Sequence, residues 1–361
     1  MKITVKKTGR ILAIVAGIVV VLLLFLIILL TVTEYKPADK EVLQTDGRAE
    51  KSLQIGDTID LISWNIGFGA LGDNADFFMD GGEKVMPSAK ERVKENIRAI
   101  TEVLAKEAAD IVLLQEVDEK STHSYYMDER AMIAQGLEDA GHSYENSLAY
   151  NFKTLFVPYP VPPVGREQSG LVTFSVYSSS SAERMSLPCP FPYPIRLANL
   201  KRCLLVNRIP VADSGRELVV INLHLEAYDD GAGKEAQTRM LVSLFAEEAA
   251  KGNYVIAGGD FNQTMDMVDL SLYPQQRDDL WKPGVIDTDA FENIQCLMDD
   301  RVPSCRSLDR AYDRGDPGFQ YYVIDGYLVS ENLSVQAFET MDLGFVNSDH
   351  NPVRLRITVE N

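Results

Sequence analysis

The sequence predicts one α/β domain of the α+β type, in which β-sheets pack face to face with helices outside, preceded by a single transmembrane helix. Two observations predict this fold class. An uncharged apolar run occupies residues 11–33, and after residue 53 strand-like segments outnumber the helix-like segments inserted between them. Such a mixture favours packed sheets over a purely parallel, doubly wound sheet. A chain of 361 residues has room for one large domain or two small ones.

The apolar run at residues 11–33 predicts a membrane anchor. About 20 helical residues cross the roughly 30 Å hydrocarbon core of a bilayer. Four basic residues lie within residues 1–10, whereas charges of both signs follow the run. The positive-inside rule therefore predicts a single-pass protein of the cell membrane, with residues 1–10 in the cytoplasm and the remainder outside the cell. The rival interpretation is a cleaved signal peptide, which usually has an apolar core of roughly 7–15 residues and a small-residue cleavage site.

The polar segment 34–52 is expected to be a linker, and residues 53–361 are expected to form the folded domain. Runs of apolar and β-branched residues predict strands at 57–65, 110–117, 171–177, 203–210, 217–225, 253–258, 323–329, 334–340 and 353–359. Helical spacing of apolar residues predicts helices at 89–109, 129–140 and 234–250. Two long loops are expected at 67–88 and 265–303, and loops of that size are usually functional or mobile.

The net charge bears on whether the chain binds nucleic acid, and the cysteines bear on whether it contains disulfides. The formal net charge is -18, which opposes binding to a nucleic acid backbone, although a local basic groove would still permit it. The four cysteines are Cys189, Cys203, Cys296 and Cys305, and none forms a C-x-x-C pair. Their spacing permits two local disulfides in an oxidising compartment, and four unpaired thiols are the alternative.

Polar residues end several of the predicted strands. Asn65 ends the first strand, Glu116 closes a buried apolar run, and Asp260 and Asn262 follow another. A buried carboxylate needs a partner or a cation, and carboxylate and amide oxygens are ligands that Mg²⁺ accepts. Taken singly, each run has a plainer interpretation, such as a solvated Glu or an Asx turn. Together they indicate a site for Mg²⁺, with Mn²⁺ as an alternative.

Two histidines are candidates for proton transfer. His350 follows Asp349 just before the last strand, and an imidazole with a pKa near ~6.5 can take a proton from water near neutral pH. Asp325 lies inside an apolar strand and is the natural partner to orient His350. His224 ends another strand, where it could bind a phosphate or assist a departing oxygen. The plainer alternatives are a polar turn, a surface Asp and a satisfied core His.

The order of these residues resembles the endonuclease/exonuclease/phosphatase superfamily over about residues 57–360. The resemblance rests on Asn65, Glu116, His224, Asp260-x-Asn262, Asp325 and Asp349-His350, and on the run Ser169-Gly170-Leu171. It implies a four-layer α/β/β/α sandwich with the site at one end of the two sheets.

The resemblance also implies a role for each residue. Glu116, Asn65 and Asp349 would bind Mg²⁺. Asp260 and Asn262 would hold the phosphate, the attacking water or a second ion. His350 would be the general base, oriented by Asp325, and His224 would contact the phosphate.

These features predict a tethered, extracytoplasmic phosphoesterase that hydrolyses a phosphodiester, with a lipid headgroup or a small phosphoester favoured. The segment 152–165 is rich in Pro, Phe, Tyr and Val, which suits apolar contact better than a nucleic acid backbone. Four basic residues could meet a charged headgroup or lie on a solvated strand face: Arg196, Lys201, Arg202 and Arg208. A nuclease of the same superfamily is the alternative, and a non-catalytic tethered binding module is the alternative of another class.

Overall fold

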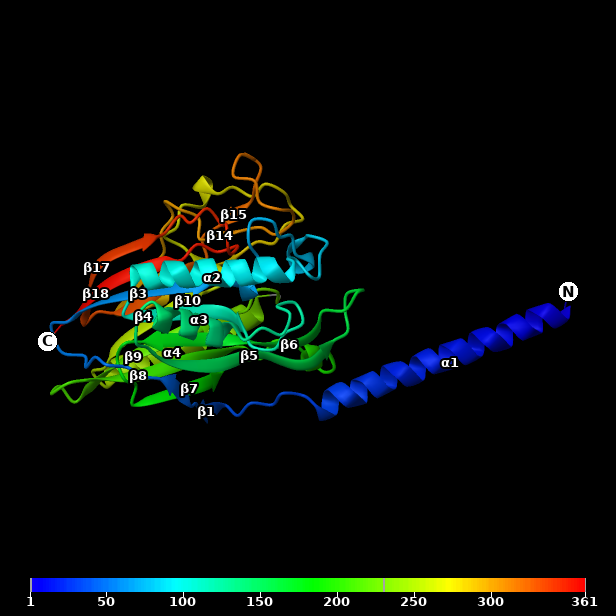
Figure 1. Cartoon of the computed structure of the whole chain (residues 1–361), viewed down its shortest axis with the longest axis horizontal. Coiled ribbons are helices and arrows are strands. Elements are labelled where there is room, and N and C mark those ends of the chain that lie inside the picture. The colour runs from blue at the N-terminus through cyan, green and yellow to red at the C-terminus, as the bar shows by residue number, and fades with distance from the viewer. Residues whose placement is uncertain (1, 230, 361) are drawn as a thin grey trace.

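Two seven-stranded sheets form the centre of the molecule, and helices cover their outer faces (Figure 1). The structure is a computed structural model that describes residues 2–229 and 231–360. In order across the first sheet lie β1 (Lys40–Val42), β7 (Ser181–Ser186), β8 (Cys203–Val211), β9 (Arg216–His224), β10 (Tyr254–Asp260), β16 (Asp325–Ser330) and β13 (Ile294–Leu297). Across the second lie β17 (Leu333–Thr340), β18 (Val353–Val359), β3 (Thr58–Asn65), β4 (Ile111–Asp118), β6 (Gly165–Ser175), β5 (Glu145–Val157) and β2 (Thr45–Gly47). Two small pairs complete the strands: β11 (Gln263–Met265) with β12 (Gly284–Ile286), and β14 (Cys305–Arg306) with β15 (Tyr321–Tyr322).

The apolar residues fall into three main layers of core, which confirms the predicted sandwich. Between the sheets, side chains such as Leu61, Leu113 and Val220 are fully buried. The helices α2 (Lys90–Glu107) and α3 (Glu129–Asp139) pack on the second sheet through an apolar face that recurs at helical spacing. The helix α4 (Ala232–Ala250) packs in the same way on the first sheet. Burial of each large apolar side chain stabilises the fold by roughly 1.5–3 kcal/mol.

Strand direction brings the polar strand ends to one edge of the molecule. β3 runs parallel to β4 in the second sheet, and β9 runs parallel to β10 in the first. A buried amide pair ties the two sheets together near these ends, where Gln115 Nε2 donates to Asn222 Oδ1 over 2.8 Å. Asn222 also donates to the carbonyl oxygens of Leu114 and Val172. The carboxyl ends of all four strands therefore meet at one end of the sandwich.

Two segments differ from the sequence prediction. Residues 34–52, expected to be a linker, contain β1 and β2, which add an edge strand to each sheet. The polar composition of this segment does not predict strands, because the hydrogen bonds that pair a strand come from the backbone and not from the side chains. The expected apolar loop 152–165 is wrong in its first part, since β5 continues to Val157 and pairs with β6. The expected loop 265–303 also contains the short strands β12 and β13.

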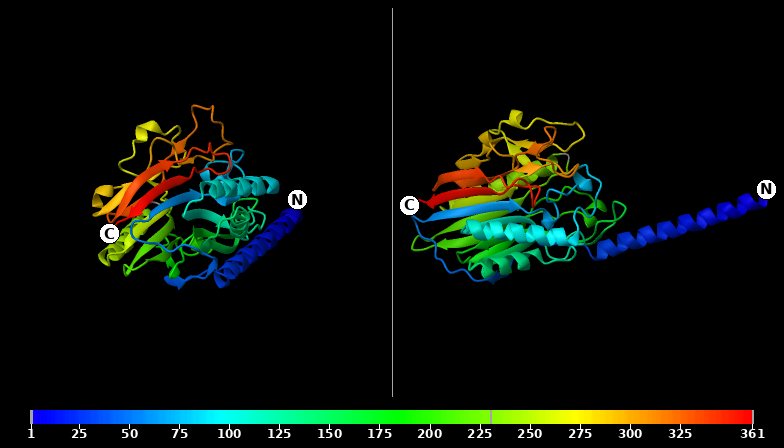
Figure 2. Two further views of the ribbon diagram at one scale, coloured as in Figure 1. Left: turned by 60° about the vertical axis from the view of Figure 1, so that its left-hand side comes forward. Right: turned by 45° about the horizontal axis from the view of Figure 1, so that its top comes forward.

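The N-terminal helix α1 (Lys2–Val32) extends away from the sandwich as a single rod (Figure 1). Its segment Thr8–Val32 is long and apolar enough to cross a membrane. Both views in Figure 2 agree that α1 leaves the domain on the side away from the C-terminus.

Candidate active site

A pocket of about 200 Å³ opens where the polar strand ends meet. Six of the eight predicted site residues line it: Glu116, His224, Asp260, Asn262, Asp349 and His350. The other two, Asn65 and Asp325, lie behind this lining and hydrogen-bond to members of it. The structure thus brings together the whole set that the sequence singled out.

His350 is held by a carboxylate on one side of its ring. Its Nδ1 lies 2.8 Å from Asp325 Oδ2, and Ser304 Oγ donates to the same oxygen over 2.7 Å. Its backbone carbonyl accepts from Trp64 Nε1. Burial alone would lower the pKa of His350, but Asp325, Cys305 and Asp349 together outweigh burial and raise that pKa well above its ordinary value. The Nε2 atom remains on the pocket side.

Asp260 lies between the two histidines. Its Oδ2 is 3.5 Å from His224 Nε2 and 3.8 Å from His350 Nε2, and it accepts from Asn65 Nδ2 over 3.0 Å. Burial, followed by the nearby Asp325 charge, raises the pKa of Asp260 to about 7. Burial also lowers the pKa of His224 well below its ordinary value, assisted by Arg202 and His350. His224 is therefore a neutral imidazole at neutral pH.

Asn262 and Asp260 form an Asx turn, as the plainer interpretation of this run expected. The Asn262 backbone N–H donates to Asp260 Oδ1 over 2.8 Å, and Asn262 adopts a left-handed φ of 50°. Its side-chain Nδ2 donates to the carbonyl of Leu225. The turn places both residues at the pocket wall, at the end of β10.

Glu116 reaches the pocket because its backbone departs from the strand. The register of β4 against β6 shifts between Leu114 and Val117, and Glu116 has a φ of 54°. A non-glycine residue in the left-handed region is strained, and bulges of this kind re-aim a side chain. Glu116 Oε1 accepts from Asn65 Nδ2 over 3.0 Å and lies 3.9 Å from His224 Nε2.

A family model for the endonuclease/exonuclease/phosphatase family matches residues 62–350, which is most of the folded part of the chain. The chain belongs to this family. Its members are metal-dependent hydrolases that act on phosphate ester bonds, and the chain is such a hydrolase. No curated protein matches it.

Solved structures of this family share the fold at low sequence identity. An endonuclease/exonuclease/phosphatase from Beutenbergia cavernae has a TM-score of 0.59 and 17% identity, over 84% of this chain and 72% of that one. D. rerio TDP2 complexed with a single-strand DNA product has a TM-score of 0.50 and 14% identity, over 84% of this chain and 99% of that one. A family protein from Leptotrichia buccalis has a TM-score of 0.50 and 12% identity, over 83% and 99%.

Three carboxylates at the pocket fit the divalent metal that endonuclease/exonuclease/phosphatase enzymes use. Burial is the main factor that raises the pKa of Asp80, Glu116 and Asp349, and each of these groups is also raised by the charge of another of the three. The pKa of Asp80 and that of Asp349 are each raised to about 6. Hard oxygen ligands whose charges repel one another are what a divalent cation would neutralise.

Asp80 was missed by the sequence prediction. It comes from the Gly- and Asp-rich loop 67–88, which the sequence marked only as functional or mobile. Tyr228 Oη donates to Asp80 Oδ1 over 2.7 Å and so fixes this carboxylate at the pocket wall. The run Asp80-Gly81-Gly82 is the sequence feature that could have indicated a turn with a carboxylate.

The side chain of Asn65 does not offer an oxygen to this cluster. Its Nδ2 donates to Glu116 and Asp260, while its Oδ1 accepts from the backbone N–H of Gly67 over 3.0 Å. A ligand role for Asn65 requires the amide to turn over and leave Gly67. In this structure the Asn65 amide instead holds the carboxylates of Glu116 and Asp260 in place.

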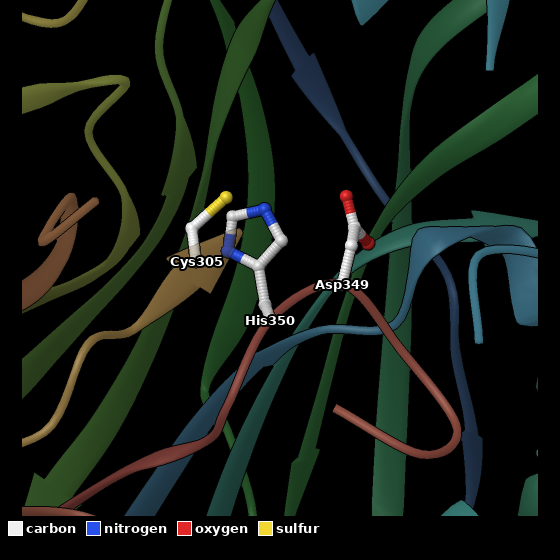
Figure 3. A group of neighbouring side chains, drawn as sticks. All are labelled: Cys305, Asp349 and His350. Carbon is white, nitrogen blue, oxygen red and sulfur yellow. The ribbon is translucent and has the colours of Figure 1, made fainter. Parts of the chain in front are cut away.

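Cys305 lies beside His350 and was not predicted at the site. Figure 3 shows its sulfur next to the imidazole ring, with Asp349 on the opposite side of the ring. Residues 305 and 350 form an isolated backbone bridge. Burial raises the pKa of the Cys305 thiol to about 12, so it stays protonated at neutral pH. Among the described residues all four cysteines are unpaired, which decides between the two alternatives left by their spacing.

Only one of the four basic residues noted in the sequence lines the pocket. Arg202 is buried, donates to the carbonyl of His224 over 3.1 Å and lies 3.4 Å from Glu226. Arg208 pairs with Glu248 instead, and Arg196 and Lys201 with Glu34. Of these four basic residues, the fold thus places only Arg202 at the pocket.

A third histidine, which the sequence prediction did not include, also lines this pocket. His123 Nε2 is 2.8 Å from Asp118 Oδ2, and its Nδ1 is 3.0 Å from Glu167 Oε1. All three residues are buried, and the ring of Phe68 covers the imidazole with a centroid separation of 3.8 Å. Burial lowers the pKa of His123, but Glu167 and Asp118 reverse this effect and raise it well above its ordinary value.

Proposed function

We propose that this enzyme is a membrane-tethered, extracytoplasmic, Mg²⁺-dependent phosphodiesterase in which His350 activates water. One observation carries the proposal. His350 has Nδ1 on the Asp325 carboxylate and Nε2 on the pocket side, next to a cluster of hard oxygen ligands. An imidazole oriented in this way is a suitable general base for the attack of water on phosphorus.

Glu116 and Asp349, which both line the pocket, are the metal ligands in this proposal, and Asp80 lines the same pocket. Asn65 would join them only after its amide turned over. When bound, Mg²⁺ would polarise a phosphoryl oxygen and neutralise developing negative charge. Mn²⁺ prefers the same kind of oxygen ligands and is the alternative.

The other residues of the pocket transfer protons or position the water and the phosphate. His350 Nε2 takes a proton from the attacking water, and the Asp325 carboxylate stabilises the imidazolium that results. His224, a neutral imidazole, donates from Nε2 to a phosphate oxygen or to the leaving oxygen. Asp260 and Asn262 hold the water and the phosphate at the end of β10, and Arg202 adds positive charge behind His224.

A lipid headgroup or a small phosphoester is the favoured substrate. The pocket walls are rich in aromatic and apolar side chains, among them Phe68, Phe77, Phe78, Phe152, Tyr159 and Trp281. The net charge of -18 opposes a long nucleic acid backbone. A nuclease of the same family is the second candidate, since one structural neighbour was solved with a single-strand DNA product.

Replacing Glu116 by glutamine tests the metal assignment. The change keeps the shape of the side chain but removes its charge, so we expect most activity and most Mg²⁺ binding to disappear while the protein remains folded. Isothermal titration with Mg²⁺ and hydrolysis of sphingomyelin, phosphatidylinositol lipids and DNA are the measurements. Glu247→Gln, an exposed change on α4, is the control. Normal turnover of Glu116→Gln at ordinary Mg²⁺ contradicts the metal assignment. If the unaltered protein binds these substrates but hydrolyses none of them, it is a binding module and not an enzyme.

Protease treatment of intact cells tests the proposed orientation. With any wall or outer membrane removed, added protease should cut the domain from the outside, because the basic residues in the first turns of α1 retain the N-terminus in the cytoplasm. An immunoblot against the C-terminus reads out the cut. Protection of the domain until the cells are lysed means that the orientation is reversed.

A further inference from the structure

The membrane anchor is seated against the domain without a flexible spacer. Leu30, in the last turn of α1, is buried, whereas the earlier apolar residues of the helix are mostly exposed. The neighbouring Thr31 Oγ1 lies 3.3 Å from Tyr193 Oη. Just beyond the helix, Glu34 lies 3.3 Å from Arg196 Nε and 3.4 Å from Lys201 Nζ. The end of α1 is thus fixed to one face of the domain.

This seating sets the depth of nearby residues relative to a bilayer. The span Thr8–Val32 is apolar up to its last residue, and two residues from Val32 to Glu34 cover at most about 7 Å. A helix that crosses the membrane therefore holds Tyr193 and the short helix η3 (Ile195–Ala198) at the bilayer surface.

Exposed apolar side chains gather at this same depth. We define the apolar rim as Leu155, Tyr159, Val161, Tyr193 and Ile195, which are 44%, 45%, 94%, 52% and 55% exposed. The first three come from the end of β5 and the turn that follows it, and the other two from η3 and the residues before it. Thr154 Oγ1 donates to the carbonyl of Leu197, which joins these two segments. Tyrosine and aliphatic side chains are the residues that dip into a membrane interface.

The catalytic pocket opens within this rim. Tyr159 of the rim lines the pocket, as do Val157 of β5 and Ala198 of η3. In Figure 1 the end of β5 and the start of β6 lie on the side of the sandwich from which α1 leaves, and the C-terminus lies on the other side. The mouth of the pocket and the anchor therefore share one face of the domain.

We propose that the apolar rim docks into the membrane leaflet from which α1 emerges, so that the pocket takes its phosphodiester from the headgroup of a lipid in that leaflet. This deepens the proposed function and rests on it. The occupant is the bilayer itself because the anchor, by its seating on η3, already holds the rim against the bilayer surface. A soluble phosphoester and a nucleic acid are the competing substrates.

Fluorescence quenching tests the docking without reference to catalysis. The full chain is reconstituted in phosphatidylcholine vesicles with brominated acyl chains, with tryptophan introduced as Val161→Trp. Met267→Trp is the matched control, since Met267 is also exposed but lies beyond β11, away from the rim. We expect strong quenching of the tryptophan at 161 and none at 267 beyond that of the two native tryptophans. Equal quenching at the two positions, or none at 161, overturns the docking.

A pair of hydrolysis assays then tests the source of the substrate. The triple variant Leu155→Asp, Val161→Asp, Ile195→Asp leaves the pocket lining unchanged. We expect it to lose at least about tenfold in the hydrolysis of vesicle lipids and to keep its rate on soluble bis-p-nitrophenyl phosphate within about twofold, because only lipid presentation needs the rim. The control is Met267→Asp, Leu270→Asp, Leu272→Asp, which removes a comparable exposed apolar set elsewhere.

The outcomes separate this inference from the proposed function. Unchanged lipid hydrolysis in the rim variant, or an equal loss on both substrates, overturns the lipid source. If the unaltered chain hydrolyses DNA but neither lipid nor the soluble diester, the proposed function fails, while the quenching result still decides whether the rim docks.

Discussion

His350 and His123 are two of the three buried histidines that line the pocket, and the carboxylates around their rings are arranged differently. His350 has a carboxylate at Nδ1 only, at 2.8 Å, and its Nε2 lies 3.8 Å from the nearest carboxylate oxygen. His123 has a carboxylate at both ring nitrogens, at 2.8 Å and 3.0 Å. In both cases neighbouring carboxylates outweigh burial and raise the imidazole pKa well above its ordinary value.

The comparison shows that a raised pKa does not by itself identify a catalytic base. A base needs a nitrogen that can exchange a proton with the substrate or with water. His350 keeps such a nitrogen on the pocket side, whereas both nitrogens of His123 are occupied. His123 is therefore suited to hold the β4 end, the turn after it and β6 together as an ionic triad with Asp118 and Glu167.

The variant His350→Ala should produce the largest effect on activity. A positioned general base contributes roughly 10²–10⁴-fold in rate, so we expect kcat to fall at least about a hundredfold while KM changes much less. Steady-state kinetics on the preferred diester is the measurement. His142→Ala, which removes a histidine bonded to the carbonyl of Ala105, is the control and should retain its kcat. Near-normal kcat in His350→Ala would mean that water is activated by the metal alone.

The variant His123→Gln should affect stability rather than proton transfer. It leaves two buried carboxylates without their cation, which lowers the free energy of unfolding by about 3 kcal/mol. Because folding raises the pKa of His123, its stabilising effect is complete below about pH 6.5 and is lost as pH rises through the higher folded pKa. Thermal unfolding over a pH series should therefore show the largest difference from the unaltered protein at the acidic end. A difference that grows with pH contradicts the ionic triad.

The variant Asp325→Asn should produce a smaller loss of activity than His350→Ala. Asp325 orients the imidazole and stabilises its charged form but leaves the base itself in place, so we expect kcat to fall by less than it does in His350→Ala. The Asp325 charge raises the pKa of His350, so its removal lowers that pKa. The base must be neutral to act, and the rising limb of the pH–rate profile should shift to lower pH. A limb that stays in place would assign it to a group other than His350.

The sequence alone predicted nine of the eighteen strands among the described residues, and the eight candidate residues that it singled out lie at the pocket or directly behind it. Residues such as Asn65, Glu116 and Asp260 each follow or end an apolar run. The apolar run predicts a strand, and the polar residue marks where that strand ends and a candidate site begins. The strand β5 was missed because its outer face mixes polar and aromatic side chains. β1 and β2 were missed because a three-residue edge strand leaves no periodic pattern.

What the sequence by itself determined is local: the apolar span of α1, the period of each helix and strand, and the chemical character of each strand end. Only the tertiary structure decided which groups meet. The bulge that turns Glu116 into the pocket depends on the register of β4 against β6, and Asp80 reaches the site through a bond to Tyr228, 148 positions along the chain. The sequence likewise does not predict the contact of α1 with η3, because Thr31 and Tyr193 are 162 positions apart. Such contacts arise from sheet order and packing, and neither composition nor periodicity encodes them in a way that a single sequence reveals.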